Sequence, residues 1–334
     1  MHIDRAHEDT GIDPVISTGS LPDASIVTSL LETAHARYLP VVDGKVADYI
    51  PALAAASPDS FGLAIVSAAG TVFTAGDVTT EFSIQSISKP FVFALVCDAL
   101  GSDIARDRVG VNSTGLPFNS VMATELSDDH TTNPMVNGGA IATTSLVPGD
   151  SAEAKWTFIR DGLSAFAGRT LEIDEAVHRS ESESNQRNRA LARLLESYGH
   201  MYFDPLEATD IYTRQCSLLV STVDLAIMSA TLADGGVNPV TGARVVSQET
   251  CTRVLAVLAT AGLYERTGEW LYDIGLPAKS GVSGGLITVA PGKGGLATFS
   301  PPLDDAGNSV RGQLATSFLS HMLGLNLFAS APVA

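Results

Sequence analysis

Two groups of predicted strands lie far apart in this chain and are separated by a long stretch of helical character. Apolar runs at 61–66 and 71–74 flank the turn Ala68-Ala69-Gly70, which is a hairpin pattern. Strand patterns return only near the C-terminus, at 276–282, 286–289 and 296–299. This order predicts an α+β fold in which both ends of the chain complete one antiparallel sheet, flanked by helices and with a helical subdomain on one side.

Helical spacing and capping residues place the predicted helices. One helix should begin at Ser25 and close before Pro40, and another should run from Ser309 to about Leu323. Four more are predicted at 152–166, 185–198, 222–233 and 247–259. We therefore expect a mobile tail at 1–22 and a single domain at 23–330. Within this domain, 23–100 and 262–330 form the sheet part and about 101–261 form the helical subdomain, with a pocket between them.

The charge balance limits the partners of the chain. Its 334 residues carry 20 Lys and Arg against 37 Asp and Glu, a formal net charge of -17. Such a surface repels phosphate backbones and anionic lipid, which argues against nucleic acid and membranes as partners. The first residues have no basic region followed by an apolar core, and no run of about 18 apolar residues occurs. These features predict a cytoplasmic protein.

The cysteines favour the same compartment. Cys97, Cys216 and Cys251 are odd in number, scattered and set among apolar residues. This usage is typical of reduced thiols in a protein core rather than of a disulfide framework. A catalytic cysteine is the alternative, but no Cys-x-x-Cys or Cys-His pairing supports it.

A serine and a lysine stand three residues apart just before an apolar run. In a helix Ser86 and Lys89 would share one face, and Pro90, tolerated only in the first turn, places the helix start close to Ser86. This helix should end at Gly101. Unpaired amides at a helix start favour developing negative charge, so the pattern predicts a serine nucleophile activated by a lysine. The same spacing also occurs on many solvated helix surfaces, so the hypothesis needs partners elsewhere in the chain.

Lys279-Ser280-Gly281, on a predicted strand, supplies such a partner. A Lys-Ser/Thr-Gly triplet on a strand beside an S-x-x-K serine resembles the signature of the penicillin-recognising enzymes. In that arrangement the amide after the glycine, here that of Val282, would pair with the amide of Ser86 to form an oxyanion hole. Lys89 can accept the serine proton only when neutral, which burial and nearby positive charge favour by lowering its pKa.

Six motifs in order resemble those of the serine-dependent glutaminases, in their short bacterial form. These enzymes have a β-lactamase-like fold and hydrolyse L-glutamine to L-glutamate and ammonia. The resemblance covers about residues 25 to 325. The motifs are Tyr49-Ile50-Pro51, Gln85 to Pro90, Asn133-Pro134-Met135-Val136-Asn137, Ser180 to Ser184 with Arg187-Asn188, Gly275 to Val282, and Ser300-Pro301-Pro302-Leu303-Asp304.

The resemblance implies a role for each matching residue. Ser86 would be the nucleophile, Lys89 its activating group, and Tyr264 a second acid or base that passes a proton to departing ammonia. Glu181 would pair with the ammonium group of the substrate. Asn137, Asn188 and Tyr212 would hydrogen-bond the α-carboxylate of the substrate. Tyr49, Gln85 and Val282 would also line the pocket. Which of Lys89 and Tyr264 takes the serine proton stays open.

Read without the resemblance, several of these residues are unremarkable. Tyr264 would be a half-buried aromatic, Glu181 and Glu183 solvated charges, and Asn188 a polar group on a helix surface. The chain also departs from the usual family pattern. Residues 182–187 read Ser-Glu-Ser-Asn-Gln-Arg instead of the more usual Arg-Glu-Ser-Gly-Asp-Arg, and Gly138 replaces a commoner alanine. These departures could change affinity and substrate preference.

The sequence predicts no metal site and no cofactor. Its seven histidines form no ligand spacing, and the Gly-rich stretch 281–285 lacks the residues and setting of a phosphate loop. The resemblance implies L-glutamine as substrate and further copies of the chain as partners, in a homodimer or homotetramer. Two alternatives are an acyltransferase acting on β-lactams or D-alanyl peptides, and a module that binds an amino acid without turnover.

Overall fold

A five-stranded antiparallel sheet forms one side of the molecule in the computed structural model, which describes residues 19–48 and 50–329. The strands are β1 (Gly62–Ser67), β2 (Val72–Gly76), β5 (Ala278–Ser280), β6 (Gly285–Ala290) and β7 (Gly294–Phe299), in the order β2-β1-β7-β6-β5. Every neighbouring pair is antiparallel. The predicted hairpin is confirmed, with Val66 opposite Val72. The predicted α+β fold is confirmed as well, because β1 pairs with β7 and so joins the two ends of the chain.

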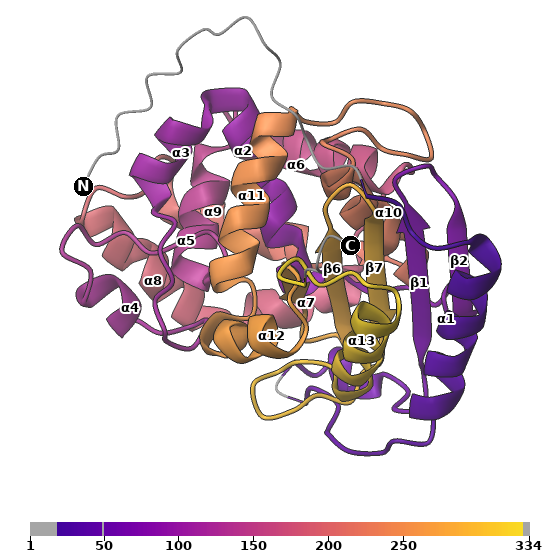
Figure 1. The fold of residues 1–334 in the computed structure, drawn as a ribbon. Helices are drawn as coiled ribbons and strands as arrows, with labels where there is room; N and C mark the ends of the chain where they lie inside the picture. The colour runs from indigo at the N-terminus through magenta and orange to yellow at the C-terminus, as the bar shows by residue number, and fades with distance from the viewer. Residues whose placement is uncertain (1–18, 49, 330–334) are drawn as a thin grey trace, which may run out of the picture.

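Helices cover both faces of the sheet (Figure 1). On one face lie α1 (Ala24–Tyr38), α12 (Thr267–Asp273) and α13 (Val310–Met322), whose apolar side chains pack with those of the strands in one cluster. On the other face α10 (Thr222–Ala233) packs along β7, β1 and β6. The bounds predicted for α10 are those observed. However, the sequence placed this helix in the helical subdomain, whereas it supports the sheet.

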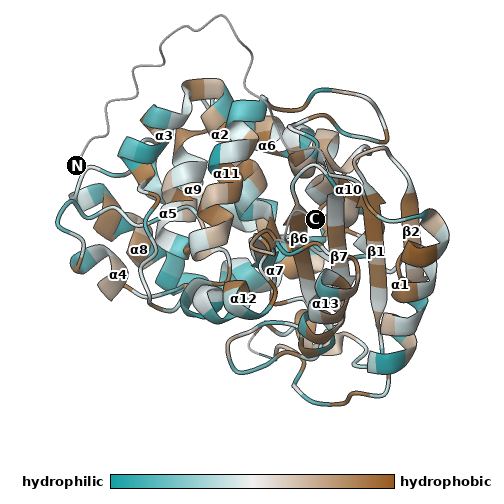
Figure 2. Cartoon of the chain, viewed as in Figure 1, coloured by the Kyte–Doolittle hydropathy of each residue, from teal (hydrophilic) through white to brown (hydrophobic). Residues whose placement is uncertain are grey.

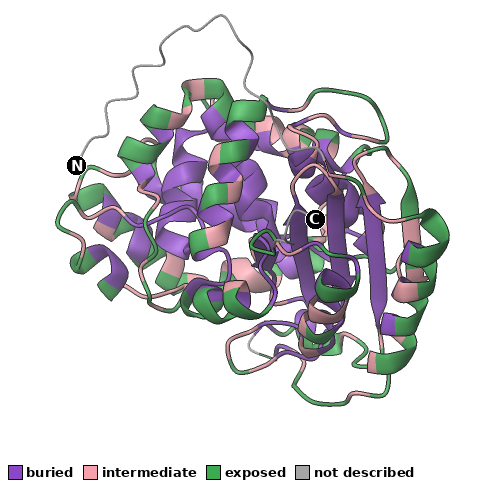
Figure 3. Ribbon diagram, viewed as in Figure 1, coloured by how far each residue is buried: buried purple, intermediate pink, exposed green. Residues whose placement is uncertain are grey.

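The remaining helices gather beside the sheet around α2, which is the central helix of this part (Figure 3). Ten of the residues of α2, from Ser88 to Cys97, are buried, and the helix ends at Gly101, as predicted. Residues all round this helix are apolar, which is the pattern of a helix enclosed on every side. These helices are α2 (Ser88–Leu100), α3 (Ser102–Val109), α4 (Met122–Glu125), α5 (Asn137–Leu146), α6 (Ala152–Ala167), α7 (Glu175–Ser184), α8 (Gln186–Ser197), α9 (Pro205–Cys216) and α11 (Gln248–Ala261).

A second, very small sheet lies between the two parts. It consists of β3 (Phe82–Ser83) and β4 (Leu219–Val220), which pair antiparallel. Neither strand was predicted from the sequence, because two residues are too few to show a periodic pattern. Three short 3₁₀ turns complete the described structure: η1 (Leu53–Ala55), η2 (Gln85–Ile87) and η3 (Tyr264–Arg266).

The largest apolar cluster runs from the sheet into the helical part without interruption. It joins Val66, Ile287 and Ala297 of the strands to Trp156 and Val254 of the helices. Figure 2 shows the matching pattern, with apolar colour along the strands and along the inner sides of the helices. Cys97, Cys216 and Cys251 are buried and unpaired, as predicted. Among the described residues, no helix is both long and apolar enough to cross a membrane.

Candidate active site

Ser86 lies in the tight turn η2 between β3 and α2. The preceding residue, Gln85, has a φ of 53°, a left-handed conformation that is uncommon for a residue with a side chain. Such strain persists only where the surrounding structure enforces it, and it is typical of functional sites. Residues around Ser86 are buried, whereas Ser86 itself keeps partial exposure. The turn therefore presents the hydroxyl to a cavity just before α2 begins at Ser88, in agreement with the predicted helix start.

Lys89 lies one turn further on and is 1% exposed. Its Nζ donates to the carbonyl of Met135 (3.1 Å) and to Oδ1 of Asn137 (2.7 Å). Burial lowers the pKa of Lys89 to about 7, against a smaller opposing effect of Cys216. In a large fraction of molecules this amine is therefore neutral at physiological pH, and only a neutral amine can accept a proton. Among the described residues the hydroxyl of Ser86 has no hydrogen-bond partner, so its proton is available for transfer.

Tyr264 approaches from the other side, in η3, and also has a left-handed φ, of 57°. Its Oη accepts a hydrogen bond from Nζ of Lys279 (2.9 Å), and this amine lies 4.0 Å from the centre of the tyrosine ring. Lys279 is fully buried, and desolvation followed by the charge of Lys89 lowers its pKa well below the usual value. The sequence drew attention to Lys279 through its triplet but gave it no role. The structure places it as the hydrogen-bond donor to Tyr264.

Val282 follows β5, in the turn that leads into β6. The amides of Gly281 and Gly284 pair within this turn, donating to the carbonyls of Gly285 and Gly281. The amide of Val282 has no hydrogen-bond partner in the part of the chain that the structure describes. Val282 lines the same cavity as Ser86. An unpaired amide in such a place is what an oxyanion hole requires, because its donor must be available when negative charge develops.

Glu181 projects from α7 into the same cavity. Its Oε1 accepts a hydrogen bond of 2.5 Å from Nε2 of Gln85, which also donates to Oγ of Ser83. The carboxyl keeps partial exposure toward the cavity, while protein surrounds most of it. Burial raises the pKa of Glu181 to about 7, against the opposing effect of the Gln85 hydrogen bond. The strained backbone of Gln85 therefore places its side-chain amide between Ser83 and the carboxyl of Glu181.

Asn137, Asn188 and Tyr212 form a connected group at the cavity wall. Nδ2 of Asn137 donates to Oδ1 of Asn188 (3.0 Å), and Oη of Tyr212 donates to Oδ1 of Asn137 (3.3 Å). Since Lys89 donates to that same oxygen, this group is connected directly to the buried amine of Lys89. Asn137 is the first residue of α5, Asn188 lies on α8 and Tyr212 on α9, so three helices converge here.

One cavity of about 270 Å³ collects most of the predicted site. Its lining includes Gln85, Ser86, Asn137, Glu181, Asn188, Tyr212, Tyr264 and Val282. Lys89 lies behind this wall and is not part of the lining. Tyr49 lies outside the described residues. The lining also contains residues that the sequence analysis did not select, namely Ile50, Phe118, Asn119, Ser184, Asn185, Arg187, Cys216, Ser280, Ala306 and Gly307. Ile50, Ser184, Arg187 and Ser280 lie inside the matched motifs, so their position in the sequence was a signal. The others lie outside the motifs, and no sequence pattern marked them.

The cavity suits a small molecule that carries both charges. It offers one carboxylate, several neutral hydrogen-bond donors and acceptors, and a serine hydroxyl next to an amine of lowered pKa. Within the described residues, no group of three or more His, Cys, Asp or Glu side chains could hold a metal ion. The chemistry that these groups support is nucleophilic attack by Ser86 on a carbonyl, with proton transfer by Lys89 and Tyr264.

Comparison with known proteins gives one consistent match. The family model described as glutaminase matches residues 44–328. "Glutaminase 2" of Yersinia pestis is 57% identical over 322 residues, which cover 96% of this chain and 95% of that protein. A glutaminase of Brucella suis biovar 1 is 51% identical over 304 residues, covering 91% and 96%.

Solved structures agree with this match. A probable glutaminase, YbaS, superposes with a TM-score of 0.91 at 44% identity, covering 92% of this chain and 100% of that one. The structure of Mglu in its glutamate form superposes with a TM-score of 0.87 at 37% identity, covering 91% of this chain and 70% of that one. The likeness therefore spans the sheet and the helical part together.

Proposed function

This chain belongs to the glutaminase family and is an amidohydrolase, and from that premise we propose that it hydrolyses L-glutamine through a seryl acyl-enzyme. The observation that supports this most directly is the single cavity in which Ser86 lies together with Glu181 and with the group formed by Asn137, Asn188 and Tyr212. A zwitterion needs a charge for its ammonium and fixed donors for its carboxylate, and this cavity has both.

In the proposed complex the carboxylate of Glu181 pairs with the substrate ammonium. Asn137, Asn188 and Tyr212 donate to the α-carboxylate, which leaves the side-chain amide directed at Ser86. The distance between these two groups of residues then selects the length of the side chain. Since Lys89 already donates to Asn137, occupation of the carboxylate position also changes the surroundings of the activating amine.

The chemistry proceeds in two steps. Oγ of Ser86 attacks the side-chain carbonyl carbon while its proton passes to Lys89 or Tyr264, and the carbonyl oxygen takes negative charge opposite the amides of Val282 and Ser86. Collapse of this intermediate breaks the C–N bond as Tyr264 protonates the nitrogen, so ammonia leaves and a glutamyl ester remains. Water then adds to the ester, gives its proton to the same groups and releases L-glutamate and the free serine.

Ammonia release tests the proposal. Purified protein should release ammonia from L-glutamine in proportion to the glutamate formed, and Ser86→Ala should reduce kcat by roughly 10⁴-fold or more, as loss of a nucleophile does. The variant should keep the melting temperature of the parent, because the substitution removes one partly exposed hydroxyl. Ammonia release at the parental rate in the folded variant would refute the seryl mechanism. L-Asparagine, shorter by one methylene, is the matched substrate control.

The cytoplasmic location and the homodimer or homotetramer expected from the sequence remain proposals. Size-exclusion chromatography with light scattering measures the second directly. The single domain at 23–330 also remains a prediction, and urea unfolding of the whole chain would test it.

A further inference from the structure

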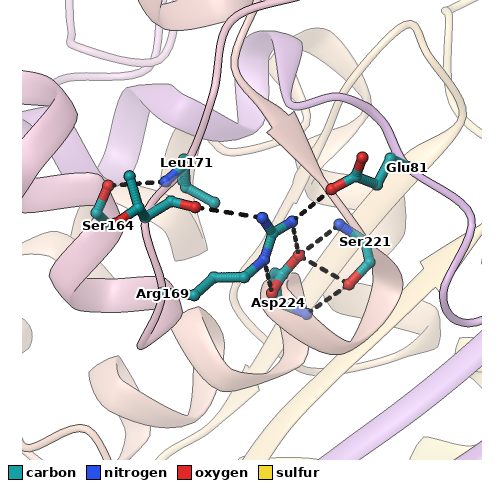
Figure 4. Close-up of polar contacts among 7 residues, drawn as sticks. Glu81, Ser164, Arg169, Leu171, Ser221 and Asp224 are labelled. Atoms are coloured by element: carbon teal, nitrogen blue, oxygen red, sulfur yellow. Dashed lines mark hydrogen bonds and ion pairs between the residues drawn. The ribbon is translucent and has the colours of Figure 1, made fainter.

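Arg169, just after α6, holds together two acidic residues that are distant in the sequence (Figure 4). Its Nε and one terminal nitrogen donate to the two carboxylate oxygens of Asp224 at 2.9 and 2.7 Å. The same terminal nitrogen donates to Oε1 of Glu81 at 2.9 Å. The other terminal nitrogen donates to the carbonyl of Thr170. We call Arg169, Asp224 and Glu81 the clasp.

Asp224 is the buried centre of the clasp, with its side chain 7% exposed. Oδ2 of Asp224 also accepts from the backbone amide (2.7 Å) and the hydroxyl (2.8 Å) of Ser221, the N-cap of α10. The hydroxyl of Ser221 in turn accepts from the amide of Asp224, which completes a capping box. The paired Arg–carboxylate geometry therefore fixes Arg169 to the start of the helix that supports the sheet.

Each residue of the clasp lies within four residues, along the chain, of one of three adjacent extended segments. Glu81 directly precedes β3, Asp224 lies four residues beyond the end of β4, and Arg169 lies three residues before segment 172–174. The pairing of β3 with β4 joins two of the segments. Further backbone hydrogen bonds run from the amide of Ile84 to the carbonyl of Leu218 (2.8 Å), from that of Leu219 to Glu172 (2.8 Å) and from that of Asp174 to Ser217 (2.8 Å). With β4 in the middle, they form a three-segment ribbon.

The other end of this ribbon leads into the candidate active site. β3 continues directly into the turn of Gln85 and Ser86. Segment 172–174 continues into α7, which carries Glu181 and has Asp174 as its N-cap. β4 follows α9, which carries Tyr212. The positions of Ser86, Glu181 and Tyr212 therefore depend on the register of this ribbon. The clasp secures the ribbon at the end far from the site.

We propose that Arg169 is a positioning residue, whose clasp with Asp224 and Glu81 sets the alignment of Ser86 relative to Glu181. Arg169 is not part of the cavity lining, so it acts through the ribbon alone. The roles given to Ser86 and Glu181 rest on the proposed function. A shift of about 1 Å in such an alignment is enough to cost roughly 100-fold in rate.

The structure offers a matched control for this arginine. Arg160 lies on α6, forms an ion pair of 2.9 Å with Asp161 and has the same 39% side-chain exposure as Arg169, but among the described residues its side chain donates hydrogen bonds to Asp161 alone. An exposed pair of this kind contributes little to stability. Arg160→Gln therefore removes an equivalent charge without touching the clasp.

The test compares Arg169→Gln, Arg169→Lys, Glu81→Gln and Arg160→Gln by steady-state ammonia release, at a temperature well below each melting transition. We expect Arg169→Gln to lower kcat/KM by roughly 10- to 100-fold and to raise KM at least threefold, because Glu181 and Ser86 lose their mutual alignment. Arg169→Lys and Glu81→Gln should give kcat/KM and KM values between those of Arg169→Gln and the parent. Arg160→Gln should have the parental values. Loss of folded protein would instead lower the apparent kcat and leave KM unchanged.

A second measurement does not depend on glutamine turnover. Amide hydrogen exchange of Ile84, Asp174 and Leu219, whose amides donate across the ribbon, should accelerate at least tenfold in Arg169→Gln and stay unchanged in Arg160→Gln. Parental KM and parental exchange in a folded Arg169→Gln would overturn the positioning role. A parent protein that releases no ammonia would instead refute the proposed function, and the exchange result would still decide whether the clasp secures the ribbon.

Discussion

Lys89 and Glu181 show what burial does to opposite charges within one site. The same desolvation lowers the pKa of the amine to about 7 and raises that of the carboxyl to about 7. Each group therefore changes its charge near neutral pH, where an isolated lysine would be charged and an isolated glutamate ionised. Both become suited to their proposed tasks as the pH rises, since Lys89 must be neutral to accept a proton and Glu181 must be ionised to hold an ammonium.

The pH dependence of KM follows from Glu181. As the pH falls through about 7, the carboxyl takes up a proton and loses the charge that pairs with the substrate ammonium, so KM for L-glutamine should rise by up to tenfold per pH unit. Glu181→Gln should raise KM by roughly 30-fold or more at pH 8, since breaking a buried hydrogen-bonded charge pair costs about 2 kcal/mol or more. The variant should also lack the change of KM with pH, which initial-rate measurements from pH 5 to pH 9 would determine.

Stability provides an independent check on the same group. The folded state holds this proton more tightly than the unfolded state, in which the pKa is near 4.5. Ionisation of Glu181 therefore lowers the free energy of unfolding as the pH rises from about 4.5 to about 7. Without substrate, Glu181→Gln should be more stable than the parent at pH 8, and this difference should shrink toward pH 4.5. A variant that is less stable at pH 8 would contradict the assigned pKa direction.

At the scale of elements, the close approach of α10 to β7 depends on Gly295. A Cβ atom placed on this residue would lie 2.4 Å from the amide nitrogen of Ala230 and 2.6 Å from the carbonyl oxygen of Ala226, both in the backbone of α10. Backbone atoms cannot rotate away as the end of a flexible side chain can. The absence of a side chain at Gly295 therefore allows the helix to lie directly on the central strands.

Gly295→Ala should lower the free energy of unfolding by about 2–3 kcal/mol, the cost of overpacking a rigid contact. Gly268→Ala is the matched control, because Gly268 lies in α12 with no atom within 4 Å of an added Cβ. There the alanine should stabilise the helix by about 0.5–1 kcal/mol. Urea unfolding of both variants measures the difference. Equal stability of the two would mean that α10 shifts away from β7 at little cost.

Some elements could be predicted from the sequence and others could not. Periodic apolar spacing predicted the bounds of α10 and the hairpin of β1 and β2, because each has enough residues to display its period. Asp23, rather than the predicted Ser25, precedes the first residue of α1, a shift of the kind usual at helix ends. Glu181, read from its neighbours alone, was a solvated charge, whereas the fold surrounds most of it with protein. The clasp could not be predicted, since no local pattern links Glu81, Arg169 and Asp224.

For the whole molecule, the uninterrupted apolar cluster predicts that the sheet and the helical part unfold together. The chain has two tryptophans, and they report on different regions. Trp156 lies in the cluster that joins the strands to the helices, while Trp270 lies in the cluster on the opposite face of the sheet. In Trp156→Phe and in Trp270→Phe, the urea midpoint from the remaining tryptophan should coincide with that from far-UV circular dichroism. Separate midpoints would show that the two parts are independent domains.

The pairing of β1 with β7 has a consequence for the synthesis of this protein. Ser67 ends β1, and its partner strand begins only at Gly294, so most of the chain must leave the ribosome before the pair can form. At 5–20 residues per second, the interval is roughly 10–45 seconds. During this time β1, whose first five residues are buried in the finished fold, has only β2 beside it and exposes its other edge. The nascent chain is therefore most open to aggregation, and most in need of chaperones, before its last forty residues are made.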